Sequence, residues 1–254
     1  MWLLVLSLLG IFEFQEMGGL ASLLSAQATV VDIPVVASFN PSLQLKNKKS
    51  GIVFTFTKPY SLSDLKYLKI SLWLRRWGIG FSSAGLMHPG YGEWIFSLSK
   101  GLPLFNSLSF GLLLSFYHLS IPNYESDFFF SLSPSLSFIP ERFLISFILL
   151  HTNQPKTLYG EMMPLTFILG IGIPLRDGID FYFDYERERE EAMRGGLKVA
   201  YKILYGGIGF ETNPIRFTSG FGLSLNSFNF NYGLRWHPQL RESHILSLEL
   251  KSSL

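Results

Sequence analysis

The chain has 254 residues, with 21 Lys and Arg against 19 Asp and Glu, so its formal net charge is +2. Charged residues make up 16% of the sequence, below the roughly 25% of soluble domains, whereas aromatic residues also reach 16%. The basic residues are scattered, which argues against nucleic-acid binding, and the lack of cysteine excludes disulfides and thiol chemistry. After the N-terminus, no uninterrupted apolar stretch approaches the ~20 residues of a membrane helix.

The first residues are similar to a secretory signal peptide. Residues 2–12 form an apolar run of h-region length, too short to cross a membrane as a helix, although no Lys or Arg precedes it. We expect residues 1–15 to be the signal peptide, with processing near residues 10–15. The alternative is a buried N-terminal helix. Residues 16–50 would then form a plug or a periplasmic segment.

From residue 51 onward, apolar and polar residues alternate with a period of two. In the segment 228–237, for example, large apolar residues alternate with Asn229, Asn231 and Arg235, which places each set on one face of a strand. Most segments are about 9–13 residues long, near the ~9–11 that cross a bilayer when tilted. Strands are predicted at roughly 51–58, 66–74, 76–85, 91–100, 106–118, 125–137, 142–152, 162–173, 178–187, 193–204, 206–213, 214–226, 228–237 and 243–251.

The connections between these strands differ in length according to parity. Those after even-numbered strands are short and those after odd-numbered strands are longer, apart from the Asn213-Pro214 corner. Short periplasmic turns and long outer loops are typical of a membrane barrel, whereas a soluble sandwich has no reason to sort its loops. The sequence therefore predicts an all-β fold, a transmembrane antiparallel up-and-down β-barrel of about 14 strands over residues 51–254. The alternative is a secreted soluble β-sandwich that binds carbohydrate or a partner protein.

Two terminal motifs resemble those of the FadL/PorV-like outer-membrane barrels. Near the C-terminus, residues 236–240 (WHPQL) resemble the last hairpin of that group. At the N-terminal end, the order acid, glycines, small-residue segment, Asp and Asn-Pro resembles a short segment that packs inside or beneath the barrel in that group. The residues of this plug motif are Glu16, Gly18, Gly19, Asp32, Asn40 and Pro41.

This resemblance implies a location in the outer membrane of a diderm bacterium, in contact with outer-membrane lipid. It implies passage of a hydrophobic or small amphipathic solute, as on the FadL side of the group. It equally implies an envelope or secretion-associated role with secretion-system proteins as partners, as on the PorV side. The sequence leaves both functions open.

Polar residues on the strand faces are candidates for the lumen of such a barrel. Asp180, Asp184 and Glu186 alternate along one predicted strand, and Lys198 and Lys202 share a face of the next. Their hairpin could pair them as a ladder of ions, either to neutralise the interior or to form a charged constriction that selects solutes. The lumen-facing candidates are Asp180, Asp184, Glu186, Lys198, Lys202, Asn229, Asn231, Arg235 and Glu249.

Catalytic and metal-binding patterns are missing from the sequence. The five histidines have no metal-ligand spacing, and no Gly-x-Ser-x-Gly motif occurs. Gly206-Gly207-Ile208-Gly209 precedes no predicted helix, so it does not predict a phosphate-binding loop. We expect a non-enzymatic protein with no cofactor and no metal.

Overall fold

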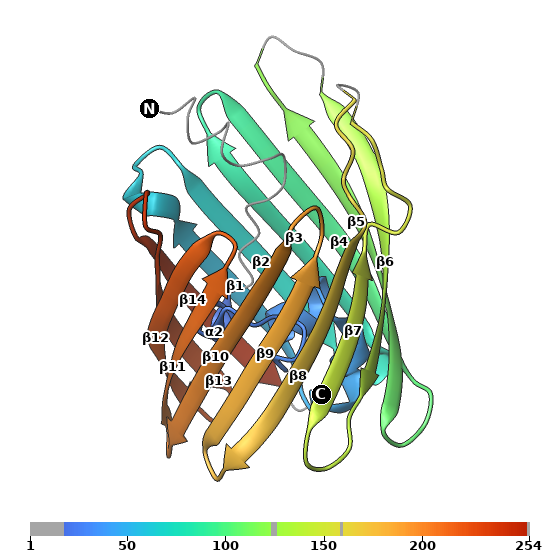
Figure 1. Cartoon of the computed structure of the whole chain (residues 1–254), viewed down its shortest axis with the longest axis vertical. Coiled ribbons are helices and arrows are strands. Elements are labelled where there is room, and N and C mark those ends of the chain that lie inside the picture. The colour runs from blue at the N-terminus through green and yellow to red at the C-terminus, as the bar shows by residue number, and fades with distance from the viewer. Residues whose placement is uncertain (1–17, 123–125, 158–159, 253–254) are drawn as a thin grey trace.

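The computed structural model describes residues 18–122, 126–157 and 160–252, which form a closed antiparallel barrel of fourteen strands (Figure 1). Strands adjacent in sequence pair with one another, and β1 (Ser50–Lys58) pairs with β14 (Ser243–Ser252) to close the sheet. The predicted fold class is confirmed, and the sandwich alternative is wrong because first and last strands pair. The others are β2 (Lys66–Leu74), β3 (Ile79–His88), β4 (Tyr91–Pro103), β5 (Leu108–Ser120), β6 (Asp127–Phe138), β7 (Leu144–Leu150), β8 (Thr166–Arg176), β9 (Ile179–Arg187), β10 (Glu191–Tyr201), β11 (Leu204–Thr212), β12 (Ile215–Leu225) and β13 (Phe228–Trp236).

The outer surface of the barrel is apolar and its inner surface is largely polar. Along β4, the outward side chains of Phe96 and Leu98 are 49% and 43% exposed, whereas Ser97 and Ser99 between them point inward and are buried. A soluble barrel would show the reverse arrangement, because its apolar residues would pack inside. An apolar outer band over alternating strands is the surface that a lipid bilayer solvates. Among the described residues, no helix is long and apolar enough to cross a membrane.

The N-terminal segment lies inside the barrel, in the half nearer the short turns (Figure 1). It contains α2 (Gly19–Leu24), α3 (Ile33–Ser38) and the 3-10 helix η1 (Pro41–Leu45), and we call residues 18–45 the plug. Many of its apolar side chains, such as Leu24, Val36 and Leu43, have no exposed surface. The largest hydrophobic core of the described residues is therefore built around the plug.

Glycines on β10 to β12 let the plug approach the barrel wall closely. A Cβ atom on Gly209 would lie 2.6 Å from Oγ1 of Thr218 and would overlap the carbonyl oxygen of Leu24. A Cβ atom on Gly196 would overlap the same carbonyl oxygen from the neighbouring strand. These strand glycines thus create the groove that accepts the end of α2.

The wall of the barrel is uneven beside β7. β6 pairs with β5 along its length, but only its residues 135–138 pair with β7. Beyond them, the chain after β7 follows the open edge of β6: the amide of Thr152 donates to the Leu132 carbonyl at 2.9 Å, and the Asn153 side chain donates to the Phe130 carbonyl at 2.9 Å. The β7–β8 connection therefore provides hydrogen-bond partners for some of the β6 backbone groups that β7 does not pair with.

Candidate functional site: the lumen around the plug

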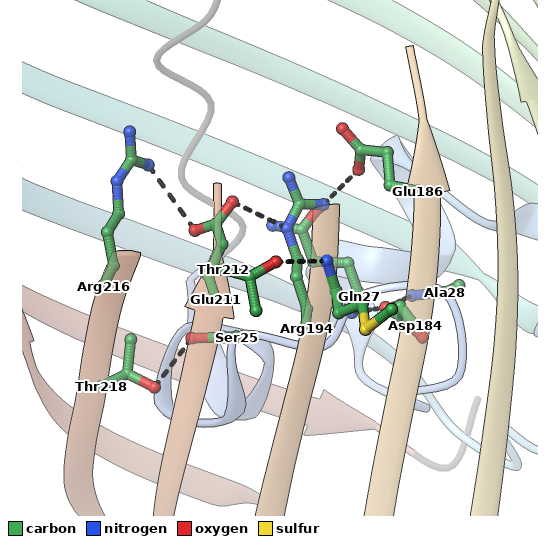
Figure 2. Close-up of polar contacts among 11 residues, drawn as sticks. Ser25, Gln27, Ala28, Asp184, Glu186, Arg194, Glu211, Thr212, Arg216 and Thr218 are labelled. Atoms are coloured by element: carbon green, nitrogen blue, oxygen red, sulfur yellow. Dashed lines mark hydrogen bonds and ion pairs between the residues drawn. The ribbon is translucent and has the colours of Figure 1, made fainter. Parts of the chain in front are cut away.

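A row of ionised side chains crosses the lumen-facing side of β9 to β12, shown in Figure 2. Arg194 on β10 donates to Glu186 on β9 at 2.5 Å and to Glu211 on β11 at 2.9 Å. Arg216 on β12 lies 3.7 Å from the other oxygen of Glu211. The two carboxylates are 16% and 8% exposed, so Arg194 compensates two largely buried negative charges.

Asp184 fastens the plug to this wall. Its Oδ2 atom accepts backbone amides of Gln27 at 2.5 Å and Ala28 at 2.8 Å, both in the turn after α2 (Figure 2). Ser25 adds a hydroxyl contact of 3.0 Å to Thr218 on β12. A fully buried carboxylate is therefore used to hold plug backbone rather than to line an open channel.

Two further ion pairs lie nearer the short turns of the barrel. Lys198 on β10 is 3.0 Å from Asp180 on β9, as their register places them directly opposite. Glu249 on β14 accepts the Asn229 side chain at 2.5 Å and Lys251 at 3.2 Å. Both pairs face inward.

The remaining lumen candidates divide into buried and exposed positions. Asn231 is buried and accepts the hydroxyl of Tyr205, and Arg235 lies opposite Thr218, one of the inward-facing residues. Lys202 does not belong to the ladder, and its assignment to the lumen is wrong. β10 ends at Tyr201, so Lys202 enters the turn to β11, where it is exposed and lies 5.2 Å from the Tyr201 ring centroid.

The described residues of the N-terminal motif lie within the plug and hold it together. Asp32 caps α3 and accepts the amides of Ile33 at 2.9 Å and Leu20 at 2.7 Å, which ties α3 to α2. Burial raises the pKa of Asp32, although these two amides and the charge of Lys251 oppose the shift. Gly19 donates to Ser247 at 2.8 Å. Glu16 lies outside the described residues.

The end of the plug binds a wall of serines. Asn40 donates to the Ala28 carbonyl and accepts the Ser42 hydroxyl at 2.5 Å, so it fixes the turn before η1, where Pro41 follows it. The Ser42 hydroxyl is also 2.6 Å from that of Ser137 on β6. Ser99 donates to the Ala37 carbonyl at 2.9 Å. Small hydroxyls satisfy buried plug backbone without filling the space that the plug occupies.

Above the plug, the same wall opens into a small pocket with a volume of about 40 Å³, part of which is open to solvent. Small side chains such as Ser82, Ala84 and Ser115 leave this space, and Ser38 and Phe39 of the plug help to line it. Hydroxyl groups and one Lys alternate with aromatic and aliphatic surface, so the pocket is amphipathic. Its lining residues are Ser38, Phe39, Tyr67, Lys69, Ser82, Ala84, Ile95, Ser97, Leu113, Ser115, Tyr117, Ser133, Leu150 and His151.

His151 closes one side of the pocket immediately after β7. Its Nδ1 is 2.8 Å from the Ser131 hydroxyl, its amide donates to Ser133 at 3.2 Å, and its backbone has a positive φ of 56°. Burial lowers the pKa of His151 to about 4. The imidazole is therefore neutral at pH 7 and acts as a hydrogen-bonding group, not as a cation.

Sequence reasoning missed Arg194 and Glu211 as residues of the site. Arg194 and Lys198 are four residues apart on one strand and therefore share a face. The inward assignment of Lys198 thus also predicts that Arg194 faces the lumen. Lys69 on β2 and His151 after β7 meet at the pocket because the sheet curves into a barrel. Their separation in the sequence does not predict this proximity.

Comparisons with known proteins agree on the fold. No protein-family model matches the chain, and no curated protein is similar to it in sequence. Among solved structures, the CymD monoaromatic hydrocarbon channel superposes with a TM-score of 0.65 at 10% identity, covering 94% of this chain and 97% of that one. A deletion mutant of the TodX monoaromatic hydrocarbon channel superposes with a TM-score of 0.60 at 9% identity, covering 96% and 100%. At these identities, the likeness shows a shared barrel fold.

Proposed function

We propose that this protein is a non-enzymatic outer-membrane channel of a diderm bacterium that passes a hydrophobic or small amphipathic solute. The observation that carries the proposal is the amphipathic pocket that lies on the plug inside an apolar-surfaced barrel. Aromatic and aliphatic walls favour an apolar solute body, and convergent hydroxyls orient a polar group. Two barrels of the same fold are named as channels for monoaromatic hydrocarbons, which supports the same solute class here.

The resemblance of the terminal motifs to FadL/PorV-like barrels supports the same proposal. In the structure, the described residues of the N-terminal motif lie within a plug inside the barrel, which suits the FadL side of that group. An envelope or secretion-associated role is the second candidate. It is favoured by the extent of plug contact, because hydrogen bonds from both walls hold the plug and would have to break before a solute passed through the lumen.

Paired substitutions on β3 test solute passage. Ser82 lines the pocket, whereas Ser83 is the next residue and belongs to the opposite face of the strand. Ser82→Phe should fill the pocket, and Ser83→Phe should add an aromatic group to the lipid-facing surface. We would measure uptake of labelled p-cresol and toluene by diderm cells carrying each variant in the outer membrane, with fractionation and heat-dependent gel mobility confirming a folded barrel.

The expected result is that wild type and Ser83→Phe raise uptake above the empty host and that Ser82→Phe returns it to the background. Uptake equal to the background for a correctly inserted wild-type barrel would contradict the channel and favour the envelope role. Wild-type uptake by Ser82→Phe would mean that the solute does not pass through this pocket.

A further inference from the structure

The two ends of the barrel carry very different surface charge. Among the described residues at the plug end, nine Lys and Arg side chains are exposed against two acids, Glu141 and Asp177. At the opposite end, the described residues include five exposed basic and five exposed acidic side chains. The small net charge of the whole chain conceals this asymmetry. The nine basic residues are Lys46, Lys48, Lys49, Arg75, Arg76, Lys100, Arg142, Arg176 and Lys202.

Six of these cations gather on one side of the plug end. Within the described residues, no acid lies within ion-pair distance of any of them. Their recorded polar contacts are to backbone: Arg75 donates to the Lys48 carbonyl at 2.7 Å, and Lys49 to the Asn226 carbonyl at 3.3 Å. We call this group the basic rim; it consists of Lys46, Lys48, Lys49, Arg75, Arg76 and Lys100.

The basic rim adjoins the lipid-facing wall of the barrel. On β4 the outward row that begins with Phe96 and Leu98 continues to Lys100, which donates to the carbonyl of Trp77. The Trp77 side chain is 58% exposed, and Phe105, in the turn after β4, is 73% exposed. Tryptophan and long basic side chains at the border of an apolar band are typical of the membrane–water interface. The basic rim therefore lies at the depth of lipid headgroups.

We propose that the basic rim binds anionic phospholipid headgroups of the leaflet that faces the plug end. Clustered Lys and Arg attract anionic lipid over about a Debye length, and guanidinium groups bind phosphate oxygens in pairs. Lys100, Trp77 and Phe105 favour lipid over an acidic protein, because they lie on or beside the outer wall. The inference requires that the barrel be membrane-embedded, but it is independent of solute passage.

Fluorescence quenching by brominated lipid tests this proposal on the full chain. The protein would be reconstituted into mixed phosphatidylcholine and phosphatidylglycerol vesicles, with bromine on one lipid or on the other. Subtracting the signal of Trp77→Phe isolates the emission of Trp77 beside the basic rim. The rim variant combines Lys46→Gln, Lys48→Gln, Lys49→Gln and Arg76→Gln; the matched control removes four charges from the opposite end by Lys66→Gln, Lys156→Gln, Arg189→Gln and Arg241→Gln.

If lipids were distributed at random, quenching of Trp77 would follow the fraction of phosphatidylglycerol in the bilayer. In wild type and the matched control at low salt, we expect brominated phosphatidylglycerol to quench Trp77 about twofold or more above that random value. The rim variant should fall to the bulk value, and high salt should do the same to wild type. Equal enrichment in wild type and the rim variant, or its loss in the matched control, would overturn the proposal. Binding of polyglutamate to the solubilised wild type alone, without lipid enrichment, would instead identify a protein-docking surface. Failure of the wild type to insert, seen as unchanged gel mobility on heating, would contradict the membrane barrel itself.

Discussion

The two walls of the lumen hold the same plug by different chemistry. On β4 to β7 the polar contacts are neutral hydroxyls, such as Ser42 against Ser137. Gly101 and Gly111 also let the plug approach this wall closely, and a pocket remains above the plug. On β9 to β12 the plug contacts a buried carboxylate, the Thr218 hydroxyl and strand glycines, and a row of ion pairs lies beside these contacts within the wall. Neutral hydroxyls tolerate an empty or wet neighbour, whereas buried charges require a fixed partner.

The two walls therefore have different roles: one holds the plug rigidly, and the other leaves room for a solute. The charged wall should supply most of the energy that fixes the plug, because each of its charges is costly to leave unpaired. The hydroxyl wall should contribute little per group but keep room for a solute. Four measurements can contradict or refine this division, and they are given from the largest expected effect to the smallest.

The largest effect is expected from Arg194→Met on the charged wall. The substitution keeps the length of the side chain but leaves Glu186 and Glu211 without their closest cation. We expect a loss of about 3–5 kcal/mol in the free energy of unfolding, measured by urea unfolding in lipid vesicles. Lys198→Met is the control, because its ion pair with Asp180 is about a quarter exposed and should cost about 0–1 kcal/mol. Equal costs would mean that the charged row is not the rigid part of the wall.

The second effect concerns pH and His151 in the hydroxyl wall. Its pKa is lowered to about 4 by burial, whereas the unfolded chain takes up a proton near pH 6.5. The neutral imidazole thus contributes stability that is complete above pH 6.5 and is lost as pH falls toward 4, by up to about 3 kcal/mol. Urea unfolding at a series of pH values should show this loss in wild type, and His151→Gln should abolish that part of it. An unchanged pH profile in the variant would contradict the assignment.

The third effect is expected where the plug meets the strand glycines. Gly209→Val would place a side chain against the Leu24 backbone, so the end of α2 must move; overpacking of this kind costs about 1–3 kcal/mol. Gly206→Val is the control, because a Cβ atom there would lie 3.4 Å from its nearest neighbour, the Gly220 carbonyl oxygen. Limited proteolysis should cleave the plug faster in Gly209→Val alone. Equal cleavage would show that α2 is not held by close packing at this glycine.

The smallest effect is expected from Ser115→Ala in the pocket. The substitution removes a hydroxyl contact of 3.0 Å to Ser97, and Ser97 can take a water molecule in the pocket instead. We expect the free energy of unfolding to fall by an amount near the lower end of about 0.5–1.5 kcal/mol, measured by urea unfolding in lipid vesicles. A loss as large as that of Arg194→Met would remove the distinction between the two walls.

Several features of this protein could be predicted from individual residues. The alternation around Asn229 and Asn231 placed them inward, and both are buried in the structure. Within the predicted ion ladder, Asp180 and Lys198 do form an ion pair, whereas Glu186 pairs with Arg194 and Asp184 accepts plug amides. The prediction that Lys202 faces the lumen was wrong, because a residue beyond the end of a strand no longer follows the alternation of that strand. Arg194 was missed because its importance comes from acids on two neighbouring strands, and pairing register fixes those contacts.

The sequence by itself determined the number of strands, their faces and their antiparallel order, because period-two alternation and turn residues are local properties of the chain. Tertiary structure showed that the first and last strands pair and close the sheet. The sequence also predicted that residues 16–50 form a plug or a periplasmic segment. Tertiary structure decided how that segment uses the barrel: which wall binds it through Asp184, which through serines, and where the pocket remains. It also decided that exposed basic residues distant in sequence form one rim. The physical reason is that the curved, closed sheet brings together the plug contacts, the pocket residues and the basic rim. Their distances in space cannot be predicted from their separation in the sequence.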